Sequence, residues 1–154
     1  MNVYKEELNV SYQVKDFMTK EVHTVDVDAS VAEAAKIMAN DEKYEGYVII
    51  LKKGKPQGIL TERDIINKVL SKELNPKKTK VIDVMSSPLV TIDPDEDLSK
   101  AAQIMSENNV RKLVVIKDSI IYGIITSKGI SQHFQDYVDR SVRDIIRWTA
   151  SLGI

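Results

Sequence analysis

The chain contains the same stretch of sequence twice, and this duplication constrains its fold more than any other feature. Eight residue types recur 67 positions later, with Met18, Thr24, Asp26, Asp28, Ala34, Ala35, Ile37 and Met38 matched by Met85, Thr91, Asp93, Asp95, Ala101, Ala102, Ile104 and Met105. Further along the offset is 65, where Gly-Ile-Leu-Thr-Glu-Arg-Asp at 58–64 pairs with Gly-Ile-Ile-Thr-Ser-Lys-Gly at 123–129. The second copy keeps the threonine and loses the aspartate.

Each copy predicts a strand, helix, strand, strand, helix series, and therefore an α/β (α+β) fold. Ser30 and Glu33 form a capping box ahead of an apolar helical face, and Asp97 caps the matching helix. Two short apolar runs rich in β-branched residues predict core strands, each followed by a turn and a second strand. The closing helix is expected to start at Thr61 in the first copy and near Thr126 in the second.

The duplication divides the chain into five segments. We expect an N-terminal extension at 1–13, a first repeat at 14–70, a linker at 71–80, a second repeat at 81–134 and a C-terminal helical tail at 135–154. The linker carries four lysines, which we expect to be solvated. The tail has an apolar stripe at Val138, Val142, Ile145 and Ile146. Such a stripe is expected to be buried against its own core or a partner subunit.

The overall charge argues against a nucleic-acid or membrane partner. Lys and Arg total 22 against 23 Asp and Glu, a net charge of −1, so the chain lacks the basic balance that a polyanion favours. Its apolar runs are short and its N-terminus is polar, which predicts neither a membrane span nor a signal peptide. With no cysteine, the composition fits a cytoplasmic protein.

The motif at 58–64, preceded by a Thr-Val strand, an Ala-Ala-x-x-Met helix and an apolar strand, resembles the CBS domain, named for cystathionine β-synthase. Its repetition over most of the chain resembles the tandem CBS pair called a Bateman module. The resemblance implies two pseudo-symmetric repeats packed through their sheets, with two clefts. In many members these clefts bind adenosine-containing ligands and regulate another activity.

The resemblance carries the roles of the motif's threonine and aspartate to Thr61 and Asp64. A threonine at a helix N-cap stands beside unpaired amides and the positive end of the helix dipole, which favours a phosphate. One turn later, the Asp64 carboxylate could accept both hydroxyls of a ribose. The alternative is an N-cap and a first-turn acid that stabilise the helix without a ligand. Since such an acid is worth about 0.3 to 1 kcal/mol, Asp64→Ala is expected to abolish ribose-dependent binding with little loss of stability.

Other residues enter the ligand site through the resemblance. Arg111 and Lys112 stand where family members often carry basic residues that reach ligand phosphates, although an ordinary exposed pair is the alternative. Family clefts are composite, so the remaining residues of the first cleft would be Met85, Leu89, Val90 and Val110. For these apolar side chains, core packing is the competing interpretation.

The second cleft is predicted to be weaker because Gly129 offers no carboxylate to a ribose. It should bind nucleotide weakly, bind something different or stay empty. Its residues would be Met18, Val22, His23, Gly46, Thr126 and Lys128. Gly129→Asp is expected to create or strengthen this site.

No enzyme is expected. The chain has two histidines, no cysteine, no acids spaced for a metal site, and no glycine-rich phosphate loop of the Walker or dinucleotide type. We therefore predict no catalytic residue, no metal and no cofactor.

Two functions remain. The first is a regulatory module that senses AMP, ADP or ATP. S-adenosylmethionine is less favoured because its sulfonium would gain nothing from Arg111 and Lys112. The second is a ligand-free module that forms a dimer or docks a separately encoded enzyme or transporter. The family resemblance implies a homodimer, whose contact Trp148 and Leu152 could extend. The regulated partner is not identified by the sequence.

Overall fold

A computed structural model describes residues 12–43 and 45–151, except for the side chains at 136–138, 140, 141, 144, 145, 148 and 149. Most of the predicted N-terminal extension therefore lies outside the described residues. The same holds for Leu152 and the side chains of Val138, Ile145 and Trp148, on which the apolar stripe and the dimer contact partly depend.

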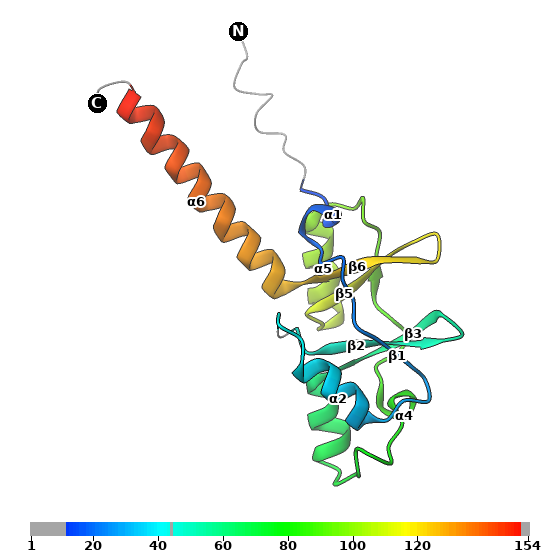
Figure 1. The fold of residues 1–154 in the computed structure, drawn as a ribbon. Helices are drawn as coiled ribbons and strands as arrows, with labels where there is room; N and C mark the ends of the chain where they lie inside the picture. Colours follow the sequence, from blue (N-terminus) through cyan, green and yellow to red (C-terminus); the bar gives the residue numbers. More distant parts are fainter. Residues whose placement is uncertain (1–11, 44, 152–154) are drawn as a thin grey trace. The chain divides into compact units, whose positions relative to one another are not determined.

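The first repeat has the predicted order of elements (Figure 1). After a short helix α1 (Val14–Phe17) come β1 (Thr24–Asp26), α2 (Val31–Ala39), β2 (Tyr47–Lys52), β3 (Lys55–Thr61), α3 (Glu62–Asp64) and a π-helical segment η1 (Ile65–Leu70). Strands β1 and β2 are parallel, β2 and β3 are antiparallel, and together they form a three-stranded sheet in the order β1-β2-β3. The predicted closing helix exists, but its second part is π-helical rather than α-helical.

The second repeat follows the same plan. It contains α4 (Val81–Val84), β4 (Thr91–Ile92), α5 (Leu98–Asn108), β5 (Lys112–Lys117), β6 (Ile120–Thr126) and α6 (Ser127–Ser151), with a sheet in the order β4-β5-β6. Helix α6 continues from the closing helix through most of the predicted tail (Figure 1). The structure thus confirms the mixed α+β fold with two similar repeats.

The helix caps form as the sequence predicts. The Ser30 hydroxyl accepts a hydrogen bond from the Glu33 amide at 3.2 Å, and the Glu33 carboxylate accepts one from the Ser30 amide at 2.7 Å. Asp97 caps α5 through the Ser99 amide at 2.7 Å. These caps satisfy amides that have no partner inside the helix, so the local sequence fixes where both helices begin.

The chain divides into two compact units that do not follow the repeat boundaries. One, the first-repeat unit, comprises residues 20–91 and 118–120; the other, the second-repeat unit, comprises the described residues up to 19 together with 92–117 and 121–151. The opening segment of each repeat thus packs on the strands of the other repeat. Thr19 and Ile124 exchange two backbone hydrogen bonds in one unit, and Ser86 and Ile59 do so in the other.

The core of the first-repeat unit lies between its sheet and its helices. It is formed by buried apolar residues of α2, β2, β3, η1 and α4, namely Val31, Ala34, Met38, Val48, Ile50, Leu60, Val69, Val81 and Val84. Their burial holds β3 and the start of α3 in place, and the candidate site lies at that junction.

Candidate functional site

Thr61 ends β3 and caps α3, so the motif lies at a strand-to-helix corner. Its hydroxyl accepts a hydrogen bond from the Asp64 amide at 3.3 Å. The Asp64 carboxylate in turn accepts one from the Thr61 amide at 3.0 Å. This reciprocal capping box is the arrangement that the sequence predicts as the ligand-free interpretation of the two residues.

Asp64 does more than cap the helix, because its carboxylate is a buried hub. Asp64 is only 7% exposed. Oδ2 also accepts the Thr61 hydroxyl at 3.0 Å, while Oδ1 accepts the Ser86 hydroxyl at 2.8 Å and the Lys68 ammonium at 2.9 Å. Burial raises the pKa of Asp64, but the hydrogen bonds from Lys68, Ser86 and Thr61 outweigh it and leave the pKa below its ordinary value.

Ser86 and Lys68 were missed by the sequence analysis. Lys68 follows Asp64 by four residues, a spacing at which opposite charges meet on a helix, so this pair had a local signal. Ser86 is 22 residues away from Asp64 and arrives with the opening segment of the second repeat. Only the alignment of Ser86 with Thr19 in the duplication hints at its position.

The burial of Asp64 raises the stability loss that we expect from Asp64→Ala above the small loss expected from the sequence. The sequence expectation rests on the small stabilisation that an acid in the first helical turn provides. Removing this buried carboxylate takes an acceptor away from Thr61 and Ser86 as well as from the more exposed Lys68, which costs more than the loss of a surface cap.

Gly58 leaves room for the segment that carries Ser86. A Cβ at Gly58 would lie 2.6 Å from the Met85 sulfur and 2.8 Å from the Ser86 carbonyl oxygen. Gly123 plays the same part in the other unit, where a Cβ would collide with the Thr19 carbonyl. The glycine that opens each motif is therefore required for the close approach of another segment of the chain.

The second copy of the motif keeps the cap without the carboxylate. Thr126 is buried, and its hydroxyl accepts the Gly129 amide at 2.9 Å. His133, which aligns with Lys68, is held by the Gly129 carbonyl at 2.8 Å through Nδ1. A Cβ at Gly129 would lie 3.1 Å from the Thr126 hydroxyl, so Thr126 would have to shift by a few tenths of an ångström to admit it.

The remaining predicted site residues divide between the two units. Thr61, Asp64, Met85, Leu89, Val90, Val22, His23 and Gly46 belong to the first-repeat unit, whereas Val110, Arg111, Lys112, Met18, Thr126 and Lys128 belong to the second-repeat unit. Within the first-repeat unit, residues 81–86 pack on β3 through the bridge between Ser86 and Ile59. This packing brings Met85 to the strand that leads to Asp64. Arg111 is exposed just before β5, and its carbonyl accepts the Ser127 amide at the start of α6.

A second polar cluster surrounds His23. Its Nε2 lies 3.2 Å from Oδ1 of the buried Asp41, which also accepts the amides of Lys43 and Glu45. Burial raises the pKa of Asp41, but these hydrogen bonds and His23 bring it below its ordinary value. The His23 ring packs against Tyr47, with ring centroids 5.8 Å apart. His23 is therefore placed by structural partners.

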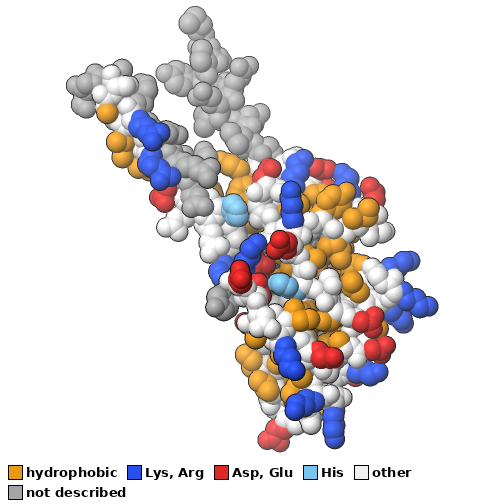
Figure 2. Space-filling view, in the orientation of Figure 1, with side chains coloured by type: hydrophobic (Ala, Val, Ile, Leu, Met, Phe, Trp, Pro, Cys, Tyr) orange, Lys and Arg blue, Asp and Glu red, His pale blue; other side chains and the backbone are white. Residues whose placement is uncertain are grey.

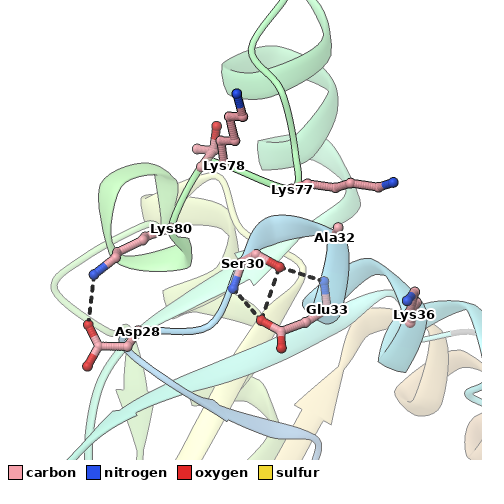
Figure 3. A pocket seen from close by; sticks show the side chains of 9 residues that line it. Asp28, Ser30, Ala32, Glu33, Lys36, Lys77, Lys78 and Lys80 are labelled. Carbon is pink, nitrogen blue, oxygen red and sulfur yellow. Dashed lines mark hydrogen bonds and ion pairs between the residues drawn. The ribbon is translucent and has the colours of Figure 1, made fainter.

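A pocket with a volume of about 510 Å³ is lined largely by the lysines of the linker and the start of α2. Figure 3 shows Lys77 and Lys78 pointing in different directions, while Lys80 turns to Asp28 at 3.1 Å. The first amides of α2 donate to linker carbonyls. An anion would find neither converging charges nor free helix amides, which agrees with the expectation of solvated lysines.

Acidic and basic side chains are interspersed over much of the face shown in Figure 2, while lysines gather at the tip of the β2–β3 hairpin. Those at 52, 53 and 55 are exposed. Within the described residues, no group of three or more His, Cys, Asp or Glu could hold a metal ion. No helix in the same part of the chain is long and apolar enough to cross a membrane.

Comparison with models of protein families identifies the family to which this strand-to-helix corner belongs. The model of the CBS domain matches the chain twice, at residues 14–71 and 81–136. The chain belongs to the CBS domain family. Both copies of the threonine motif fall inside the matched ranges, so the resemblance stated from the sequence is confirmed.

Individual CBS proteins resemble the chain over most of its length. The CBS domain-containing protein YhcV of Bacillus subtilis is 32% identical over 112 residues, which cover 73% of this chain and 78% of that protein. The chain spans about half the length of several other curated relatives, between 44% and 56%.

Two solved structures show the same fold. The CBS domain pair of protein MJ0100, in complex with 5′-methylthioadenosine and S-adenosyl-L-methionine, has a TM-score of 0.72 and 30% identity, covering 82% of this chain and 98% of that one. A hexameric CBS-CP12 protein from bloom-forming cyanobacteria has a TM-score of 0.70 and 31% identity, covering 77% and 68%.

Proposed function

We propose that this CBS pair is a regulatory module, not an enzyme, and that it binds an adenosine-containing ligand at the Thr61–Asp64 corner. The observation that carries the proposal is the buried Asp64 carboxylate one helical turn after the Thr61 cap. A carboxylate can accept both hydroxyls of a ribose, so Asp64 is the group that would recognise the sugar. The similar CBS pair of protein MJ0100, which holds two adenosine derivatives, supports the ligand class.

AMP, ADP or ATP is the proposed ligand because Arg111 and Lys112 add positive charge to the site that the family resemblance implies. An arginine can bind a phosphate through two parallel hydrogen bonds. S-adenosylmethionine and 5′-methylthioadenosine, which have no phosphate, would use Asp64 alone. The ligands of the MJ0100 pair make these two compounds necessary members of any test.

The test is isothermal titration of the full chain with AMP, ADP, ATP, S-adenosylmethionine and 5′-methylthioadenosine. We expect at least one of them to bind, and Asp64→Asn to weaken that binding at least about tenfold, since hydrogen bonds to a charged group are worth roughly 1.5 to 3 kcal/mol each. Asp83→Asn, at an exposed acid of α4, is the matched control. If no compound binds at millimolar concentration, the proposal is wrong.

The phosphate contact is tested separately with Arg111→Ala, using the exposed Arg63→Ala as its control. Arg111→Ala should weaken AMP more than 5′-methylthioadenosine, because only AMP offers a phosphate. Equal losses for both ligands would remove Arg111 from the proposed site.

The asymmetry of the two copies predicts one ligand per chain. Gly129→Asp would restore the missing carboxylate near Thr126, whose hydroxyl would lie 3.1 Å from the new Cβ. A second binding event in this variant would support the equivalence of the two copies. A single event would show that the aspartate alone does not make a site in the second copy.

Self-assembly is the second candidate function, with a homodimer as the form expected from the sequence. Helix α6 exposes Phe134 by 53%, Val142 by 48% and Ile146 by 60% of their surfaces. The similar CBS-CP12 protein is hexameric. Light scattering coupled to gel filtration measures the assembly state, and Val142→Asp is expected to lower it if α6 contributes. A monomeric wild-type protein would rule this candidate out.

A further inference from the structure

All acceptor positions of the Asp64 carboxylate are occupied without a ligand. An ionised carboxylate offers about four acceptor positions. Thr61 fills two of them through its amide and hydroxyl, both at 3.0 Å from Oδ2. Ser86 and Lys68 fill the other two, at 2.8 and 2.9 Å from Oδ1. A ribose diol that donates two hydrogen bonds must therefore displace two of these donors.

The two pairs of donors differ in how readily they can leave. The two Thr61 bonds belong to the capping box, and losing them would deprive the Thr61 amide and hydroxyl of this acceptor at the start of α3. The Lys68 side chain is 41% exposed, so water can solvate its ammonium after it leaves. Lys68 also has other acceptors at hand, the Val84 carbonyl at 3.1 Å and the Ser86 hydroxyl at 3.2 Å. The pair on Oδ1 is the pair that can be exchanged.

We propose that Ser86 and Lys68 close the adenosine site, and that a ribose binds by replacing them on Oδ1 of Asp64. This inference rests on the proposed function and adds two residues that set its affinity. The wild-type affinity for the ligand is then lower than it would be without these two donors. Each binding event must first break two hydrogen bonds to the Asp64 carboxylate.

The exchange also links the ligand to the opening segment of the second repeat. Ser86 is held to β3 by two backbone hydrogen bonds with Ile59, at 2.8 and 3.0 Å. Lys68 ties the same segment to η1 through Val84 and Ser86. When a ribose takes Oδ1, the side-chain ties between 84–86 and the Asp64 corner are broken or rearranged. Ligand binding therefore changes the contacts of the segment that leads from the linker into β4.

The test compares Ser86→Ala with Ser87→Ala, an exposed serine of the same segment, by titration with AMP and with 5′-methylthioadenosine. Removing the competing hydroxyl should tighten binding about three- to tenfold, as expected for one hydrogen bond that no longer has to be broken. Lys68→Met should act in the same direction, with Lys72→Met, an exposed lysine one turn later, as its control. Both control variants should bind like the wild type.

The outcomes separate the two proposals. Tighter binding by Ser86→Ala and Lys68→Met, with unchanged controls, supports the exchange. Equal affinity in wild type and variants would show that these side chains do not compete with the ligand. Weaker binding by either variant would make that residue a ligand contact. Both of these results overturn the inference while leaving the adenosine site intact. If neither the wild type nor any variant binds either compound, the inference fails, and the adenosine site fails with it when ADP, ATP and S-adenosylmethionine do not bind either.

Discussion

Asp64 is the residue at which structural and ligand-binding roles coincide. Its carboxylate closes a capping box, binds Lys68 and accepts a hydrogen bond from a segment that belongs to the other repeat. Such a residue is expected to be needed for stability as well as for ligand binding. A loss of binding after its mutation must therefore be separated from a loss of folding.

Asp64→Ala should lower the free energy of unfolding by about 2 to 4 kcal/mol, because it leaves the buried donors around it without an acceptor. Urea denaturation measures this value, with Asp83→Ala as the exposed control. A loss below about 1 kcal/mol, the size expected for a first-turn acid alone, would mean that the hub is not formed in solution.

The same hub should give the stability a characteristic pH dependence. The pKa of Asp64 in the folded chain is below the ordinary value of 3.8. Its contribution is therefore present in full above that value and is lost as pH falls through the folded-state pKa. The stability difference between wild type and Asp64→Ala should shrink in this acid range. A difference that stays constant down to pH 2 would contradict the assignment.

Tyr47 carries a buried hydroxyl that has no hydrogen-bond partner within the described residues. Burial, and the charges of Glu45 and Asp41, raise the pKa of Tyr47 far above its ordinary value, and the nearby His23 backbone offsets only part of this rise. Tyr47→Phe removes the cost of this unpaired group and should raise the free energy of unfolding by about 1 kcal/mol. Tyr122→Phe, at a residue 42% exposed, should change little. A loss of stability in Tyr47→Phe would show that the hydroxyl has found a partner in solution.

At the scale of elements, the notable feature is the exchange of opening segments between the repeats. Helix α1 packs in the second-repeat unit, and α4 packs against β3 and η1 in the first-repeat unit. In the second-repeat unit, Lys15 of α1 is 2.9 Å from Asp95, and Lys117 of β5 pairs with the same acid. These hydrogen bonds and charges lower the pKa of Asp95 to about 2.

The exchange predicts a crossed effect for two equivalent core mutations. Val14 and Val81 are 67 positions apart and both are fully buried. Val14→Ala should speed amide exchange in β6, and Val81→Ala should speed it in β3, each losing about 2 kcal/mol of local stability. The amide exchange rates of Ile124 in β6 and Ile59 in β3 distinguish these two effects. Faster exchange only within the mutated repeat would contradict the observed packing.

The elements differ in how far the sequence could predict them. The caps at Ser30, Asp97 and Thr61 are local signals, so they set the helix starts correctly. The π-helical form of η1 has no such signal; π-helical turns are uncommon and recur at functional sites. The contact of Ser86 with Asp64 depends on the exchange of opening segments, which local patterns do not encode.

For the whole molecule, the chain is one CBS pair with two unequal copies of a motif. One copy has a threonine, an aspartate and the two donors that hold it, and the other has a threonine and a glycine. The family and the α+β repeats could be recognised from the duplication because both depend on local periodicity. The ligand could not, since it depends on contacts that the sequence alone does not place.

The central claim is that Asp64 binds the ribose of an adenosine ligand, and a double-mutant cycle tests it most directly. Wild type and Asp64→Asn are titrated with AMP and 5′-methylthioadenosine, and with the 2′,3′-dideoxy form of each. For the compound that binds, removal of the hydroxyls should weaken wild-type binding at least about tenfold and Asp64→Asn binding much less, because the acceptor is already impaired. Equal losses in both proteins would show that Asp64 does not contact the ribose.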